Sequence, residues 1–202
     1  TFDPVIIDQE LGWAAGIGFN MVRVFLHHLP WQQDAAAFSQ RIDLFLSIAE
    51  KHDIDVMFVL FDDVWNPVPQ PGKQPEPTPG VHNSGWVQSP GAAILGDIHR
   101  HDELEPYVRG ILSRYGDDER VAVWDLYNEP GNLNAIPYGN AEVDDKPKYS
   151  LILLEKVFAW ARSEKPIQPL TSGVWRVKDG RWLGEDKDDP GAALFDFMLQ
   201  HS

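Results

Sequence analysis

An amide and a carboxylic acid stand side by side where an apolar stretch of the sequence ends. Residues 121–127 are mostly branched or aromatic, as in a buried strand, and Pro130 cannot donate to a strand ladder. Asn128 and Glu129 therefore fall at the carboxyl end of this predicted strand. Ligands of parallel α/β proteins bind just outside such ends, so Glu129 is a candidate proton donor to a substrate. The alternative interpretation is an acidic loop residue that faces water.

Polar or aromatic residues also follow the other predicted strands. Apolar, β-favouring runs occupy residues 19–26, 54–61 and 167–173. The residues at the ends of the four strands are His27 and His28, Asp62 and Asp63, Asn128 and Glu129, and Trp175. Because parallel strands end at the same edge of a sheet, this shared pattern predicts a site along one rim.

Helical patterns separate the four strands. They cover residues 3–16, 35–52, 104–115, 149–163 and 190–200. A proline-rich loop from residue 67 to residue 79 follows the second strand, and loops of this length commonly carry function or cover a site. Alternating strands and helices require crossover connections, so we expect an α/β fold with a parallel sheet in a single domain over residues 1–202.

The composition is that of an ordinary folded protein with an acidic surface. Of the 202 residues, 43% are hydrophobic and 24% are charged, which is enough for a full core. The formal net charge of −14 repels phosphate backbones and anionic lipid headgroups, so nucleic acid and membrane surfaces are poor partners. No apolar run approaches the roughly 20 residues of a membrane span. A neutral or cationic ligand fits this charge better.

The sequence offers no convincing motif for a metal or a cofactor. It has no cysteine, which excludes disulfides, zinc-thiolate sites and thiol nucleophiles. His99 and His101 are two residues apart and would face different directions on a helix. Neither a glycine-rich phosphate loop nor a Gly-x-Ser-x-Gly nucleophile elbow occurs. We therefore expect neither a metal nor a cofactor.

Four segments together resemble the retaining glycoside hydrolases of clan A, especially the cellulase-like enzymes of family five. Residues 18–25, 56–63, 124–130 and 169–175 resemble their second, third, fourth and fifth strands. The resemblance implies a (β/α)8 TIM-barrel fold, of which this chain holds about strands two to five. It also implies a hydrolase that cleaves β-linked glucan, mannan or xylan, with an oligo- or polysaccharide as its partner.

The resemblance also implies roles for three residues. Glu129 would be the general acid and base, a role that needs a second carboxylate about 5–5.5 Å away to attack the anomeric carbon. Asn128 would hydrogen-bond the 2-hydroxyl of the substrate, and Arg23 would lie beneath the nucleophile and favour its ionised form. The alternative for Asn128 is a strand-end cap, and the alternative for Arg23 is a buried ion pair with a residue such as Asp125.

Aromatic and polar residues near the strand ends are candidates for sugar binding. Trp65, Trp86, Trp175 and Trp182 lie in loops or at strand ends, and we expect Trp65 and Trp175 to stack on sugar rings. Trp13, Trp124 and Trp160 lie inside predicted helices or strands and are expected to serve packing. His27 or His28 is expected to contact sugar hydroxyls or to bond to a neighbour. Asp62 and Asp63 would either bind a sugar hydroxyl or bind nothing. Of the two, Asp63 is the predicted substrate-binding residue.

The sequence departs from the family pattern in its extent. In the family the nucleophile is a glutamate after the seventh strand, so we expect it to lie outside these 202 residues, together with the first strand and the strands after the fifth. Open strand edges favour self-association, and little activity is expected from the chain alone. Two alternatives stay open: a carbohydrate-binding pseudo-enzyme or inactive fragment, and an unrelated parallel α/β enzyme in which Glu129 is a surface acid.

Overall fold

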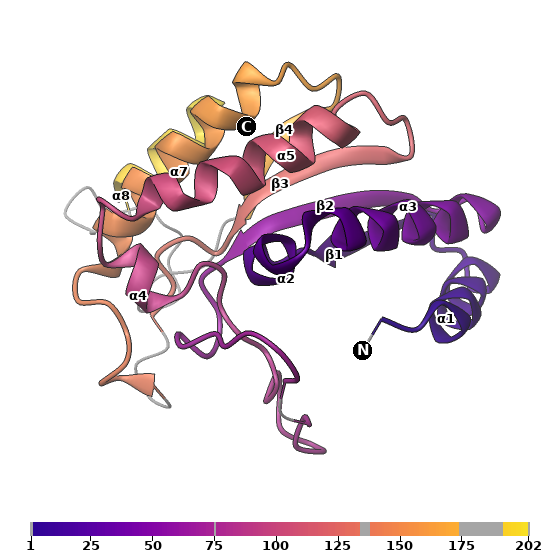
Figure 1. Ribbon diagram of the computed structural model, residues 1–202, viewed down its shortest axis with the longest axis horizontal. Coiled ribbons are helices and arrows are strands. Elements are labelled where there is room, and N and C mark those ends of the chain that lie inside the picture. Colours follow the sequence, from indigo (N-terminus) through magenta and orange to yellow (C-terminus); the bar gives the residue numbers. More distant parts are fainter. Residues whose placement is uncertain (1, 75, 134–137, 174–191, 202) are drawn as a thin grey trace.

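The computed structural model describes residues 2–74, 76–133, 138–173 and 192–201, and its centre is a parallel four-stranded sheet in the order β1-β2-β3-β4 (Figure 1). The strands are β1 (Met21–Phe25), β2 (Asp55–Asp62), β3 (Val121–Asn128) and β4 (Leu170–Gly173). The helices are α1 (Pro4–Gly16), α2 (His28–Gln33), α3 (Ala35–Lys51), α4 (Ala92–Leu95), α5 (Glu105–Tyr115), α7 (Lys146–Ser163) and α8 (Ala192–His201), and a 3-10 helix (His101–Leu104) precedes α5. Strands that follow one another in the chain are neighbours in the sheet, as in consecutive units of a β/α barrel.

The predicted alternation of strands and helices is confirmed, and the differences lie at the ends of elements and in short helices. The helix from residue 4 begins as predicted, because the Asp3 side chain accepts hydrogen bonds from the backbone N–H groups of Val5 and Ile6. Helix α2 was predicted as a loop because of Pro30, but a proline in the first turn of a helix sacrifices no hydrogen bond. Helix α4 was missed because its four residues are too few to show a helical period.

The core lies around the two central strands. The ring of Phe58 on β2 stacks on that of Trp124 on β3, with centroids 5.7 Å apart, and both side chains are buried. Leu46 of α3 and Leu154 of α7 are also fully buried in the same hydrophobic cluster. The packing roles predicted for Trp124 and Trp160 are thus confirmed, because Trp160 is 8% exposed.

Strand β1 and helix α1 carry an uncovered apolar surface. Trp13 is 62% exposed, so the packing role predicted for it is wrong. Other exposed apolar side chains of this region are Val5, Ile6, Ile17, Phe19 and Met21. Strands β1 and β4 are the two edges of the sheet, each hydrogen-bonded to one neighbour only within the described residues. The open edges expected from the sequence are therefore present in this sheet.

The proline-rich connection between β2 and α4 projects from the body of the molecule (Figure 1). Two isolated bridges tie it back to the end of β2: Asp62 pairs with Ser89, and Asn66 pairs with Val87. The base of this long loop is therefore fixed beside the carboxyl ends of the strands.

Candidate active site

The parallel register brings the predicted strand-end residues together. Asp62 is aligned with Asn128 across β2 and β3, and Asn128 is aligned with Gly173 across β3 and β4. The rim predicted from the sequence thus exists, and it carries an acid, an amide and a glycine at neighbouring strand ends.

Arg23 joins two strands beneath this rim. Its guanidinium forms an ion pair with Asp125, with Nε donating to the Asp125 carboxylate at 3.1 Å, although β2 lies between the two strands. Burial raises the pKa of Asp125, while the charge and hydrogen bond of Arg23 act in the opposite direction. The ion pair offered as the alternative role of Arg23 is therefore present. Arg23 also donates from Nη2 to Oδ1 of Asn128 at 2.7 Å, so the pair is part of the rim.

Asn128 is held in one orientation by contacts on both sides of its amide. Its Oδ1 accepts from Arg23, and its Nδ2 donates to Oδ1 of Asp62 at 2.8 Å. Gly173 allows this arrangement, because a Cβ there would lie 2.9 Å from Asn128 Oδ1 and 3.1 Å from Arg23 Nη2. Asn128 is 6% exposed and is therefore almost wholly buried.

Asp62 connects the amide to the loop that follows β2. Its Oδ2 accepts the indole N–H of Trp86 at 2.5 Å, and its Oδ1 also accepts the backbone N–H of Val64 at 3.2 Å. Burial raises the pKa of Asp62 to about 7, against the hydrogen bonds from Asn128, Trp86 and Val64, which favour the ionised form. This carboxyl group is therefore tuned to titrate near neutral pH.

Glu129 sits immediately beyond β3 in an unusual backbone conformation. Its φ is 48°, in the left-handed region, which costs about 1–2 kcal/mol for a residue with a Cβ. Its carboxylate Oε2 accepts from Nδ2 of Asn132 at 2.6 Å, and its backbone N–H donates to the carbonyl of Gly173 at 3.1 Å. The half-buried Glu129 side chain thus leaves the strand direction, so that the carboxylate is fixed at the rim.

Asp63 lies in the buried interior, whereas a substrate-binding residue was expected at the rim. It is 0% exposed, and Oδ1 accepts the Tyr127 hydroxyl at 2.7 Å. Oδ2 accepts the Gly131 N–H and the Ser150 hydroxyl, both at 2.6 Å. Burial raises the pKa of Asp63, and the charge of Lys146 opposes that rise. The assignment of Asp63 to the substrate is therefore wrong, because no carboxylate oxygen of Asp63 reaches the rim.

His27 and His28 are both engaged with neighbours, the second of the two roles expected for them. Nδ1 of His27 accepts the Leu29 N–H at 3.2 Å, so the proton is on Nε2, which donates to the Gln88 carbonyl at 3.0 Å. Nδ1 of His28 pairs with the Ser89 hydroxyl at 2.8 Å. Burial lowers the pKa of His27 to about 4 and that of His28 to about 3, so both rings are neutral.

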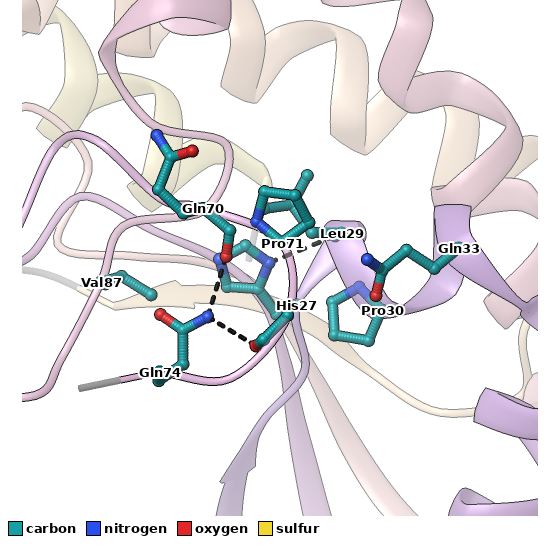
Figure 2. A pocket seen from close by; sticks show the side chains of 9 residues that line it. His27, Leu29, Pro30, Gln33, Gln70, Pro71, Gln74 and Val87 are labelled. Carbon is teal, nitrogen blue, oxygen red and sulfur yellow. Dashed lines mark hydrogen bonds between the residues drawn. The ribbon is translucent and has the colours of Figure 1, made fainter. Parts of the chain in front are cut away.

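Two adjoining hollows open beside the rim and share His27 and Val87. One contains Asp62, Trp86 and Phe25. The other lies under the proline-rich loop, where Figure 2 shows the Gln74 side chain turned back onto its own loop. Nε2 of Gln74 donates to the carbonyls of Gln70 and Gly72, at 2.8 and 3.0 Å. Within the described residues, Asp62 is the one carboxylate that lines the two hollows. The other residues that line them are apolar or neutral.

The structure brings Trp86, rather than Trp65, to the strand-end carboxyl group. The ring of Trp65 packs edge to face against His82 at 5.7 Å, and its carbonyl accepts from Gln88 at 3.1 Å. Trp65 lines neither hollow. The two other tryptophans proposed for sugar binding, Trp175 and Trp182, lie outside the described residues.

Sequence reasoning missed the separation of Asp62 from Asp63 and the role of Gly173. The strand period contains the signal for the first, because consecutive side chains of a strand point to opposite faces. Only one of two adjacent aspartates could then face the rim. Gly173 gave no signal in the sequence, since its closeness to Arg23 and Asn128 depends on the alignment of β4 with β3.

Across the described ranges, no three His, Cys, Asp or Glu side chains are grouped so that they could hold a metal ion. No helix in this part of the chain has both the length and the apolarity needed to cross a membrane.

The fold and the rim define a class of protein, a segment of a parallel β/α barrel with an Asn-Glu strand end. The sequence matches no protein-family model and none of the curated proteins at a significant level. Solved structures do match. They include the endo-1,4-β-mannanase from Rhizomucor miehei, with a TM-score of 0.63 and 16% identity over 99% of this chain and 60% of that one.

Two further structures match over smaller shares of the chain. The endo-β-1,4-mannanase from Thermotoga petrophila has a TM-score of 0.56 and 14% identity, covering 88% of this chain and 42% of that one. The β-mannanase from the blue mussel Mytilus edulis has a TM-score of 0.55 and 15% identity, covering 83% and 51%. The chain thus spans between 42% and 60% of these three structures. At such identities the likeness shows the fold alone: consecutive parallel β/α units that match part of a TIM barrel.

Proposed function

We propose that this chain carries the acid/base half of a retaining endo-β-glycanase site, with Glu129 as the general acid and base. The observation that carries the proposal is the fixed order of side chains at the rim. Arg23 orients Asn128, Asn128 contacts Asp62, and Glu129 directly follows the oriented amide. The second carboxylate, the nucleophile, is assigned to a part of the barrel beyond these residues.

In this proposal the amide of Asn128 serves the substrate. Its Oδ1 is occupied by Arg23, and one hydrogen of Nδ2 by Asp62. The second Nδ2 hydrogen has no partner among the described residues and would donate to the 2-hydroxyl of a sugar, a contact that strengthens in the oxocarbenium-like transition state. Arg23 contributes positive charge next to the position where a nucleophilic carboxylate must stay ionised.

The proposed substrate is an uncharged β-linked polysaccharide. The hollows beside the rim offer the flat face of Trp86 and neutral amides, which suit sugar rings and hydroxyls. The formal charge of −14 disfavours anionic glycans. The three solved structures described above are mannanases, so β-1,4-mannan is the first substrate to assay, followed by β-1,4-glucan and xylan.

The test compares Glu129→Gln with the parent in the natural protein that carries this chain. On polysaccharide, we expect kcat/KM to fall by about 10²–10⁴-fold, because the leaving oxygen then lacks its proton donor. On an aryl glycoside with a dinitrophenol leaving group, which needs no proton, kcat/KM should change little. Equal losses on both substrates would contradict the acid role.

The matched control is Glu119→Gln, which also removes one charge. Glu119 is exposed and precedes β3, so it lies at the opposite end of the strand from Glu129. We expect it to keep the parent activity on both substrates. A loss in Glu119→Gln as large as that in Glu129→Gln would show that general charge, rather than proton donation, sets the rate.

A further inference from the structure

We infer that Asp63 is a positioning residue that holds the turn carrying Glu129, an inference that rests on the proposed acid role of Glu129. Asp63 lies at the carboxyl end of β2 and is fully buried. It contacts the chain on both sides of Glu129 but does not reach the rim itself.

Two hydrogen bonds from Asp63 enclose the turn. Its backbone N–H donates to the carbonyl of Asn128 at 3.2 Å, just before Glu129. Its Oδ2 accepts the N–H of Gly131 at 2.6 Å, just after Pro130. Asp63, the first residue after β2, therefore fixes both ends of the short segment in which Glu129 stands.

The conformation of Glu129 explains why such a clamp is needed. A left-handed φ of 48° in a non-glycine residue is unfavourable and persists only where the surroundings over-determine it. Glu129 also precedes a proline, which narrows the backbone conformations open to it. Gly131 has a φ of 83°, and a Cβ there would lie 2.8 Å from Leu194 and 3.1 Å from Pro147. The turn is thus pressed against α7 and α8 and held to β2 by Asp63.

Asp63 is itself held by groups that do not belong to the turn. The Ser150 hydroxyl of α7 donates to Oδ2 at 2.6 Å, and the Lys146 ammonium donates to the backbone carbonyl of Asp63 at 2.9 Å. Lys146 is 0% exposed and forms an ion pair with Glu142 at 2.9 Å. Asp63 is therefore held against α7 by two contacts, one to its carboxylate and one to its backbone carbonyl.

The experiment compares Asp63→Ala with Ser150→Ala in the natural protein that carries this chain. Ser150→Ala removes one donor to the Asp63 carboxylate and leaves the Gly131 bond in place, whereas Asp63→Ala removes the acceptor of the Gly131 N–H. We expect Asp63→Ala to lower kcat/KM on polysaccharide about 10–100-fold, because a small displacement of a catalytic group is costly. The loss on the dinitrophenyl glycoside should be much smaller, whereas Ser150→Ala should lower neither value by more than about threefold.

The two proposals fail in different ways. If Glu129→Gln shows no dependence on the leaving group, the acid role fails. If Glu129→Gln shows that dependence, the acid role stands. The positioning role alone is then overturned if Asp63→Ala lowers kcat/KM equally on both substrates, or if its kcat/KM values match those of Ser150→Ala.

A second measurement needs no variant and covers the case in which Asp63→Ala does not fold. In the parent protein, the amide hydrogen of Gly131 should exchange with solvent as slowly as those of the central strand residues Trp124 and Leu126. Exchange of Gly131 at the rate of an unprotected loop amide would overturn the clamp.

Discussion

Asp62 and Asp63 are adjacent at the end of one strand, yet they do opposite things. Asp62 faces the rim, contacts Asn128 and Trp86, and lines a hollow beside the proposed site. Asp63 faces the packed interior, where Tyr127, Ser150 and Gly131 surround it. The comparison shows how the two-residue period of a strand divides one acidic pair into a group that faces the rim and a group that holds the scaffold.

The largest expected effect is the loss of stability in Asp63→Ala. This change leaves three buried donors without their acceptor and removes one of the negative charges near the buried Lys146, so the free energy of unfolding should fall by about 3–5 kcal/mol. Asp62→Ala should cost less than half as much, because Trp86 and Asn128 lie closer to solvent. Urea unfolding of both variants measures the difference. Equal losses would mean that the two aspartates have the same structural role.

A second prediction concerns pH and separates the two aspartates by titration. The raised pKa of Asp62, about 7 against 3.8 in the unfolded chain, means that the folded state disfavours the ionised form. The contribution of protonated Asp62 to the free energy of unfolding is fully present below pH 4 and is lost as the pH rises towards 7. Between pH 4.5 and 8, the parent should therefore lose about 1–3 kcal/mol relative to Asp62→Asn.

Denaturant unfolding at several pH values checks this slope. The parent and Asp62→Asn share His27 and His28, whose lowered pKa values remove stability as the pH falls below 6.5, so the difference between the two proteins isolates Asp62. A parent that gains stability over Asp62→Asn as the pH rises would show that the bonds from Trp86 and Asn128 outweigh burial.

The smallest expected effect is that of Trp86→Phe. The variant keeps an aromatic face in the hollow but removes the indole N–H that bonds to Asp62, so the unfolding free energy should fall by about 1 kcal/mol. If Trp86 also stacks on sugar, binding of a β-mannan oligosaccharide measured by calorimetry should weaken by less than tenfold. A loss of stability as large as that of Asp63→Ala would place Trp86 in the scaffold rather than at the rim.

Much of this fold could be predicted from the sequence because its elements have strong local patterns. The alternation of apolar strands and amphipathic helices predicted the parallel sheet, and Pro130 marked the end of β3. Four-residue α4 and proline-containing α2 could not be predicted, since neither has room for a helical period. The packing role predicted for Trp13 was wrong because a helical pattern does not show which other elements cover each face of the helix.

The candidate site was predicted only where the residues of a single segment form a recognisable pattern. Asn128 and Glu129 stand out beside an apolar run, and Asp125 was named as a partner of Arg23. The bond between Trp86 and Asp62 joins residues 24 positions apart through a loop whose path the sequence does not define. The same holds for the contacts of Asp63 with Ser150 and Gly131, which depend on the position of α7.

The close approach at Gly173 has a consequence for tracing distant relatives. Arg23, Asn128 and Gly173 come from three separate strands, and no side chain larger than hydrogen fits the third position while the first two keep their contact. In this chain, these three positions are therefore under a joint steric constraint. A search pattern can therefore require arginine within the first of these strands, Asn-Glu at the end of the third and glycine at the end of the fourth.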